Sequence, residues 1–279
     1  MRKIIFLDVD GTLVNDNGVV PLSAEKAVKK AREKGNEIFL CTGRSLAEIY
    51  PHILEIGFDG IIAAGGGYIE HNKEIIFHET IDNDYLVEAV NFFEENNIEF
   101  YLESNEGLYA STNLKKDLRT IVDNYPVKSV EEREELELGF GHFFDALIEN
   151  KYKDLRDVNK IVFLGSDTPF DNIREKFESK FTLHYMTVPM FGENGGELSI
   201  KGISKSSSIK LLLDHMGARQ EDTFAYGDGM NDYDMLLFAN KGIAMGNAKE
   251  DLKKIADDIT DTHDNEGIYK SFQKYLLID

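Results

Sequence analysis

Two carboxylates lie close together in the motif Asp-Val-Asp-Gly-Thr at residues 8–12, directly after an apolar run at residues 4–7. In open α/β sheets, ligands bind beyond the carboxyl ends of the strands, so we expect the side chain of Asp8 to project into such a crevice. Alternation along an extended chain turns Asp10 toward the same side, and Gly11 permits a tight exit from the strand. Taken alone, the motif is equally typical of a loop in which the aspartates only cap backbone hydrogen bonds.

A second motif, Gly-Asp-Gly-Met-Asn-Asp at residues 227–232, also follows an apolar run. Its polar residues lie at a predicted helix N-terminus, where backbone N–H groups and the helix dipole favour an anion. If both motifs follow strands of one sheet, Asp228 and Asp232 crowd the pair Asp8 and Asp10. Four carboxylates repel one another unless a cation lies among them, and a set of oxygen ligands suits Mg²⁺. Asp232 also replaces the third glycine of the dinucleotide-binding fingerprint, which argues against a dinucleotide site.

Two further parts of the sequence offer groups that could bind phosphate. Thr42-Gly43-Arg44 follows the next apolar run, and Lys205 opens a predicted helix. A hydroxyl and free backbone N–H groups, together with an ammonium group, would bind and neutralise phosphate oxygens. Alone, such a tripeptide is more typical of an ordinary turn, and most lysines are simply solvated. Two residues separate Cys41 from Arg44, which is too short for the cysteine-phosphatase signature, so Cys41 is predicted to be a buried strand residue.

The elements that must position these residues alternate between strand and helix at both ends of the chain. Ser23 is the expected N-cap of the first helix. The patterns predict strands at 4–9, 37–41 and 60–64, helices at 23–34 and 45–56, a hairpin of 68–69 with 75–77, then strands at 197–200, 223–226 and 242–245 and helices at 205–216, 230–239 and 248–256. This order argues for a parallel sheet with helices on its faces.

The middle of the chain lacks this alternation. Its patterns predict helices at 84–96, 114–123, 131–138 and 170–179 and strands at 98–103, 108–111, 160–164 and 182–187. Strands and helices without regular alternation are typical of a separate α+β domain. We therefore assign residues 1–82 and 189–279 to one α/β core and residues 83–188 to an inserted α+β domain.

Length and charge limit the classes of function. The chain has 279 residues, about two domains of ordinary size, and its formal net charge is −20. That charge argues against nucleic acid and against an anionic membrane surface, because both attract Lys and Arg. The single cysteine allows no intramolecular disulfide, and no apolar stretch suffices for a signal peptide or a membrane-spanning helix. We therefore expect a cytoplasmic protein, and nothing in the sequence implies a protein partner.

Four motifs, taken in chain order, resemble those of the haloacid dehalogenase (HAD) superfamily: Asp-Val-Asp-Gly-Thr at 8–12, Thr42-Gly43-Arg44, Lys205, and the motif at 227–232. The stretch Ala-Met-Gly-Asn-Ala at 244–248, with Glu266-Gly267 downstream, resembles the Cof-type phosphatases within it. The resemblance implies a Rossmann-like, doubly wound core of the HAD fold with an α+β cap between the second and third motifs. Gly65-Gly66-Gly67 departs from the Asn-Gly-Ala usual in that family, which removes a side chain from this region.

The resemblance also implies a Mg²⁺-dependent phosphatase for small phosphorylated metabolites, with sugar phosphates the expected class. Asp8 would attack phosphorus and become an aspartyl phosphate, and Asp10 would protonate the leaving alcohol and then activate water. Mg²⁺ would be held by Asp8, the Asp10 backbone carbonyl and Asp228, with Asp232 behind them. The group expected to bind and neutralise the phosphoryl group comprises the Val9 backbone, Thr42, Gly43, Arg44, Asn231 and Lys205, the last also being counted as catalytic.

Two other functions remain open at this level. A phosphomutase would return the phosphoryl group to its substrate instead of releasing phosphate. A phospho-aspartate receiver or a catalytically silent binding protein would use the same fold without turnover. Asp10 argues against the receiver, because ATPase-like relatives carry Thr at this place and lack the acid/base. No residue of the insertion stands out as a substrate contact, so the sequence predicts no individual substrate.

Overall fold

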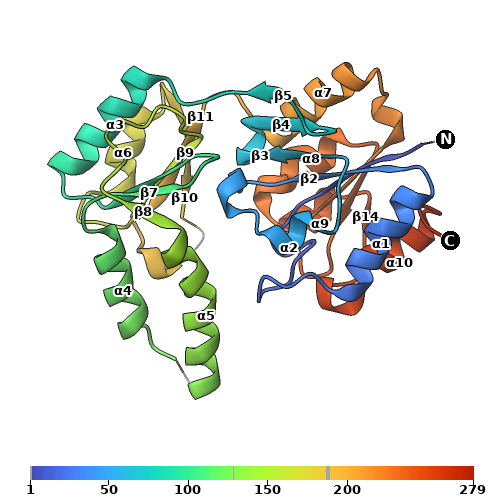
Figure 1. The fold of residues 1–279 in the computed structure, drawn as a ribbon, viewed down its shortest axis with the longest axis horizontal. Helices are drawn as coiled ribbons and strands as arrows, with labels where there is room; N and C mark the ends of the chain where they lie inside the picture. The colour runs from blue at the N-terminus through green and yellow to red at the C-terminus, as the bar shows by residue number, and fades with distance from the viewer. Residues whose placement is uncertain (1, 128, 187–188) are drawn as a thin grey trace. The chain divides into compact units, whose positions relative to one another are not determined.

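The structure is a computed structural model that describes residues 2–127, 129–186 and 189–279. The chain divides into two compact units (Figure 1). The first comprises Met1–Arg44, Ile49–His78 and Ile203–Asp279, and the second comprises Ser45–Glu48 and Glu79–Gly202. In the part of the chain that the structure describes, no helix combines the length and apolar character needed to cross a membrane.

The first unit is built on an eight-stranded sheet, in the order β14-β13-β12-β1-β2-β3-β4-β5. Neighbouring strands from β14 to β3 run parallel, and β4 and β5 add an antiparallel hairpin at one edge. Its strands are β1 (Ile4–Leu7), β2 (Glu37–Cys41), β3 (Gly60–Ala63), β4 (Tyr68–His71), β5 (Glu74–His78), β12 (Thr223–Gly227), β13 (Lys241–Ala244) and β14 (Asp258–Ile259).

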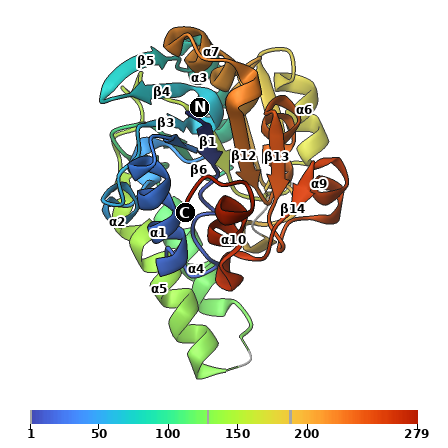
Figure 2. The same ribbon diagram turned by 90° about the vertical axis from the view of Figure 1, so that its right-hand side faces the viewer.

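Helices cover this sheet. They are α1 (Leu22–Glu33), α2 (Pro51–Leu54), α7 (Lys205–Met216), α8 (Tyr233–Phe238), α9 (Glu250–Ile255) and α10 (Gly267–Lys274). Helices α1 and α10 lie side by side, as Figure 2 shows, and α7 packs against α8. The four residues of β1 are fully buried, because a central parallel strand has neighbours on both faces. This arrangement confirms the predicted α/β core with a doubly wound parallel sheet.

Three local features of the structure differ from the sequence predictions. Helix α1 begins at Leu22 with Pro21 as its N-cap, so Ser23 is not the cap; proline fits there because its fixed φ suits a helix start. The single helix predicted at 45–56 is two short pieces, η1 (Leu46–Glu48) and α2, separated because the residue before Pro51 is extended. Strand β14 and helix α10 were not predicted.

The second unit contains a six-stranded sheet, in the order β10-β11-β9-β6-β7-β8. All neighbours are antiparallel except β7 and β8. Its elements are α3 (Asn83–Glu95), β6 (Phe100–Glu103), β7 (Leu108–Ala110), α4 (Leu114–Asn124), α5 (Val130–Ala146), β8 (Leu147–Glu149), β9 (Lys160–Phe163), α6 (Phe170–Phe177), β10 (Phe181–Tyr185) and β11 (Gly196–Ile200).

Two apolar clusters hold the second unit together, one on each face of its sheet. On one face, Phe93 and Phe177 from α3 and α6 pack with Phe163 of β9. On the other face, α4 and α5 contribute Leu118 and Phe144 to a separate cluster. Alternate residues of β6, β7 and β9 supply the two clusters, as a sheet covered on both faces requires. This α+β architecture is the one predicted for the middle of the chain.

The extent of the second unit differs from the predicted range 83–188. The strand β11 was assigned to the core from sequence, but it pairs with β10 and β9 in the six-stranded sheet. A strand five residues long carries no information about which sheet its hydrogen bonds complete, so the sequence pattern could not place it. The strand predicted at 182–187 is β10, which ends at Tyr185; residue 187 and the predicted boundary after 188 lie outside the described residues.

Candidate active site

The site is built around a buried lysine between two carboxylates. Lys205 Nζ lies 2.7 Å from Asp8 Oδ1 and 2.5 Å from Asp232 Oδ1, and all three side chains are almost fully buried. Asp8 follows β1, and Asp232 ends the short helix η5 (Met230–Asp232) after β12. Because β1 and β12 are parallel neighbours, their carboxyl ends deliver both residues to the same edge.

Lys205 is placed by the start of α7. Ser204 caps this helix: its hydroxyl accepts from the Ser207 N–H, and the Ser207 hydroxyl accepts from the Ser204 N–H at 3.0 Å. This reciprocal pair fixes the first turn of the helix and with it the direction of the Lys205 side chain. The Ser206 N–H also donates to Asp234 Oδ2 at 3.1 Å. This cap was not predicted, although a serine directly before a helix with a second serine three residues later indicates one.

The glycines at 65–67 also contact the start of α7. Ser208 Oγ donates to the Gly66 carbonyl at 2.7 Å, and a Cβ on Gly66 would lie 2.6 Å from the Ser204 carbonyl oxygen. Gly65 has a φ of +63°, in the left-handed region that favours glycine. Gly66 is the glycine that the chain shares with Asn-Gly-Ala, and the φ of Gly65 is compatible with the glycine that replaces the asparagine.

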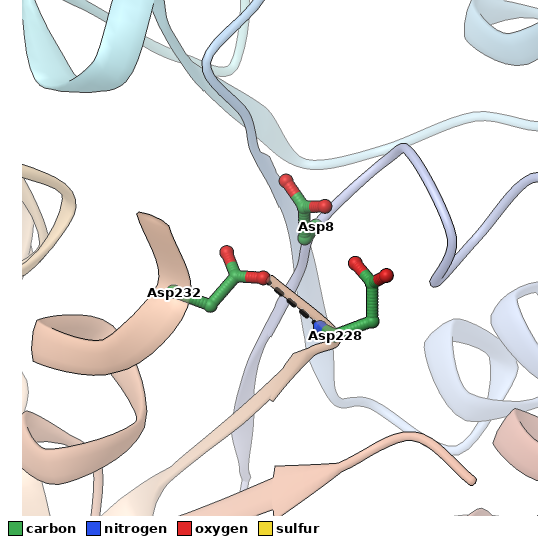
Figure 3. Close-up of side chains that lie close together, drawn as sticks. All are labelled: Asp8, Asp228 and Asp232. Atoms are coloured by element: carbon green, nitrogen blue, oxygen red, sulfur yellow. Dashed lines mark hydrogen bonds between the residues drawn. The ribbon is translucent and has the colours of Figure 1, made fainter. Parts of the chain in front are cut away.

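Asp228 completes a group of three carboxylates. One oxygen each of Asp8, Asp228 and Asp232 lie within 4.8 Å of one another (Figure 3). Asp232 Oδ2 accepts from the backbone N–H groups of Asp228 and Gly229, at 3.0 and 3.1 Å. Both oxygens of Asp232 thus already have partners, and Figure 3 shows the side chains of Asp8 and Asp228 beside it.

The negative charge of this group of carboxylates exceeds the positive charge of Lys205. Burial and the neighbouring Asp232 raise the pKa of Asp8 well above its ordinary value, although Lys205 acts in the opposite direction. Burial and Asp232 likewise raise the pKa of Asp228 to about 6. Burial lowers the pKa of Lys205, but the carboxylates of Asp232 and Asp8 outweigh it, so that pKa is raised and Lys205 is charged. The ionised carboxylates are therefore only partly compensated by Lys205.

A divalent cation fits this donor set. The carboxylates of Asp8, Asp10, Asp228 and Asp232 face two cations, Lys205 and the Arg44 that pairs with Asp10, which leaves two negative charges. Oxygen donors without nitrogen or sulfur are what Mg²⁺ prefers.

Asp10 is bound by an arginine instead of facing the other carboxylates. Arg44 donates from Nε to Asp10 Oδ2 at 2.9 Å and from Nη2 to Oδ1 at 2.6 Å. Asp10 is 60% exposed, and Arg44 is 18% exposed. This fork matches guanidinium to carboxylate in two parallel bonds. The expectation that Asp10 joins the other acids through its side chain is therefore not what this structure shows.

The residues expected around the phosphoryl group differ in their surroundings. Thr42 is buried, and its hydroxyl accepts from the Arg44 N–H at 3.1 Å. Gly43 has open space where a side chain would lie. Val9 is fully buried, and Asn231 is exposed, with Oδ1 beside Gly229. Open space at Gly43 and an exposed amide at Asn231 are compatible with a ligand beyond the strand ends.

Cys41, at the end of β2, is fully buried. Burial raises the pKa of its thiol above the ordinary range, despite the nearby Lys205. A thiol that stays protonated at neutral pH is a poor nucleophile. Cys41 is therefore a packing residue of the strand.

Comparison with known proteins identifies the family. Residues 5–272 match the family model described as haloacid dehalogenase-like hydrolase. The phosphatase YwpJ of Bacillus subtilis is 28% identical over 99% of this chain and 100% of its own length. The HAD-superfamily phosphatase BT1666 of Bacteroides thetaiotaomicron has a solved structure with a TM-score of 0.75 and 26% identity, covering 100% of this chain and 96% of that one.

A further solved structure, the HAD subclass IIB sugar phosphatase BT4131, is 25% identical with a TM-score of 0.75 and covers 99% of this chain and 100% of that one. These likenesses extend over both compact units. The chain belongs to the haloacid dehalogenase-like hydrolases, as a member of the Cof-type group that its motifs resemble.

Proposed function

We propose that this HAD-type phosphatase is a Mg²⁺-dependent phosphomonoester hydrolase that acts through an aspartyl phosphate on small phosphorylated metabolites, with sugar phosphates as the first class to test. The observation that carries the proposal is the buried Asp8 carboxylate, bonded to Lys205 and grouped with Asp228 and Asp232. The sugar phosphatase among the similar structures supports the substrate class. The first compact unit would carry the chemistry, and the second would set substrate specificity.

Asp8 is the nucleophile in this proposal. Its carboxylate oxygen forms a bond to phosphorus while the bond from phosphorus to the ester oxygen breaks. Lys205 holds Asp8 at 2.7 Å and so fixes the direction of the attacking group. Asp8, Asp228 and the Asp10 backbone carbonyl would hold Mg²⁺, with Asp232 orienting Lys205 and the Asp228 backbone. Mg²⁺ would supply charge neutralisation between an anionic nucleophile and an anionic phosphate.

Asp10 would be the general acid of the first step and the general base of the second. In the first step its carboxyl group gives a proton to the departing alcohol oxygen; in the second it takes a proton from the water that attacks phosphorus and releases Asp8. Because Arg44 donates to both oxygens of Asp10, a protonated Asp10 requires at least one of these bonds to open. Thr42, Gly43, the Val9 backbone, Asn231 and Lys205 would bind the phosphoryl oxygens, and Arg44 would join them once it leaves Asp10.

The experiment is phosphate release from an aryl phosphate and then from a panel of phosphorylated metabolites, with Mg²⁺ or with a chelator. The proposal predicts turnover that needs Mg²⁺ and is fastest on a small phosphomonoester. Product analysis in ¹⁸O-water separates hydrolysis from phosphomutase chemistry, because hydrolysis places solvent oxygen in the released phosphate. A long-lived phosphoenzyme without turnover would instead favour a receiver.

The buried free Cys41 suits a reducing compartment, so the cytoplasm is the proposed location.

A further inference from the structure

The Ala-Met-Gly-Asn-Ala motif at 244–248 has no role in the proposed reaction, yet it contacts two segments of the site, the chain around Asp228 and the chain directly after Asp10. The segment follows β13, the parallel neighbour of β12. The Met245 N–H donates to the Gly227 carbonyl at 3.0 Å, and the Lys249 N–H donates to the Asp228 carbonyl at 3.0 Å. These two backbone bonds fix residues 245–249 to the chain on either side of the Asp228 peptide.

The side chain of Asn247 contacts the second of these segments, the chain directly after Asp10. Asn247 Nδ2 donates to the Gly11 carbonyl at 2.7 Å, and its Oδ1 accepts from the His263 N–H at 3.3 Å. Gly11 directly follows Asp10 and has a φ of +68°. A Cβ on Gly11 would lie 2.3 Å from Asp228 Oδ2, so the Gly11 backbone already packs on that carboxylate. Asn247 thus links the chain after Asp10 to the segment that holds the Asp228 backbone.

The loop at 261–267 contacts Asn247 and the residue before it. The Gly246 N–H donates to the Asp261 carbonyl at 3.1 Å, and a Cβ on Gly246 would lie 2.7 Å from Thr262 N. The Gly267 N–H donates to the Thr262 carbonyl at 3.0 Å, and a Cβ on Gly267 would lie 2.1 Å from the Asp261 carbonyl oxygen. Both glycines are therefore needed for the close approach that presents the His263 N–H to Asn247.

We propose that Asn247 is a positioning residue, which fixes the Gly11 peptide and thereby the spacing between the Asp8–Asp10 motif and Asp228. The inference rests on the proposed function, because this spacing matters only if the two motifs share a cation and a phosphoryl group. Glycine has more backbone freedom than any other residue, so the peptide after Asp10 depends on external bonds to stay in one orientation. Groups that orient metal ligands change metal affinity or activity by roughly 10–100-fold when they are lost.

The test is Asn247→Ala, with Asn265→Ala as the matched control. Asn265 lies in the supporting loop, where its side chain donates to Thr262 Oγ1 at 2.9 Å and is exposed. Calorimetric titration with Mg²⁺ alone, without substrate, is expected to show roughly 10-fold weaker binding for Asn247→Ala and wild-type binding for Asn265→Ala. The kcat for an aryl phosphate falls by a similar factor, KM at saturating Mg²⁺ stays within about twofold, and Tm in chelator stays near that of the wild type.

Unchanged Mg²⁺ affinity in Asn247→Ala, or an equal loss in Asn265→Ala, overturns the positioning role. A fall of Tm in chelator that accounts for the lost activity does so as well. If Asn247→Ala does not fold, Asn247→Ser, whose side chain is too short to reach Gly11, is measured in the same way. The wild type distinguishes the two levels: a wild type that neither binds Mg²⁺ nor releases phosphate contradicts the proposed function, whereas normal wild-type behaviour with a normal variant contradicts only the role of Asn247.

Discussion

At the scale of single residues, the central feature is the excess of negative charge that Asp8, Asp228 and Asp232 carry around the buried Lys205. Lys205 bonds to Asp8 and Asp232, but among the described residues no lysine or arginine forms an ion pair with Asp228, whose pKa is raised to about 6. The sequence motifs predicted that the three aspartates would meet, because Asp8 follows β1 and Asp228 and Asp232 follow β12, its parallel neighbour. They did not predict that Asp232 would use both oxygens on Lys205 and backbone N–H groups, because hydrogen-bond partners depend on side-chain directions that spacing does not reveal.

Asp228→Asn is expected to stabilise the metal-free protein. An amide of the same shape removes the repulsion with Asp8 and Asp232, so Tm in chelator should rise by roughly 2–4 °C. The same change removes a proposed Mg²⁺ ligand, so the increase in Tm that Mg²⁺ gives the wild type should disappear. Thermal unfolding of both proteins, each with chelator and with Mg²⁺, checks both expectations. A variant that is less stable than the wild type in chelator would contradict the charge argument.

At the scale of elements, pairs of charged residues connect neighbouring strands. In the second unit, Lys160 of β9 lies 2.9 Å from Glu103 of β6, and Glu103 is only 1% exposed. In the first unit, Lys3, just before β1, lies 2.6 Å from Asp222, just before β12. The strands themselves were predicted from their apolar runs. These pairs were not, because residues far apart in sequence meet only once the order of strands is known.

Lys160→Met should destabilise the protein strongly. The change leaves the buried carboxylate of Glu103 without its cation, and breaking such a pair costs about 3–5 kcal/mol. The double variant Lys160→Met, Glu103→Leu removes both charges and should recover most of the loss. Urea unfolding of the full chain measures all three proteins. Equal stability of the single and double variants would show that the uncompensated charge is not the cause.

Asp222 gives a pH dependence with a defined sign. Hydrogen bonds from Lys3 and Arg219 hold the pKa of Asp222 below its ordinary value. Its ionised form therefore stabilises the fold above the unfolded-state pKa of about 3.9, and this contribution is lost as pH falls through the lower folded-state pKa. Asp222→Asn should cost about 1 kcal/mol at pH 7, and its difference from the wild type should shrink toward pH 3. A difference that stays constant between these pH values argues against an ionic contribution.

At the scale of the whole molecule, the sequence predicted an α/β core interrupted by an α+β domain, and the structure has both architectures. It did not predict that β11 would belong to the six-stranded sheet, nor that Ser45–Glu48 would belong to the second compact unit. Alternation of strands and helices reports which elements form but not which sheet a strand between two domains joins. Pro51, visible in the sequence, was the missed signal that the helix predicted at 45–56 had to break.

The net charge of −20 also acts on the whole molecule. Self-repulsion of a strongly charged chain favours expansion, and salt screens it, since the Debye length falls from about 30 Å at 0.01 M to about 10 Å at 0.1 M. Raising NaCl over that range should therefore raise Tm, and chelator in both samples keeps divalent cations out of the comparison. A Tm that falls with added NaCl would mean that attractive ion pairs outweigh the self-repulsion.

The most direct test of the central claim is the rate of Mg²⁺-dependent phosphate release from an aryl phosphate by the wild type and by Asp8→Asn. An amide of the same shape keeps the fold but cannot form the aspartyl phosphate. We expect turnover in the wild type and a loss of roughly 10⁴-fold or more in the variant, with Tm in chelator not lower than that of the wild type. Mg²⁺-dependent turnover by Asp8→Asn at a rate near that of the wild type would contradict it.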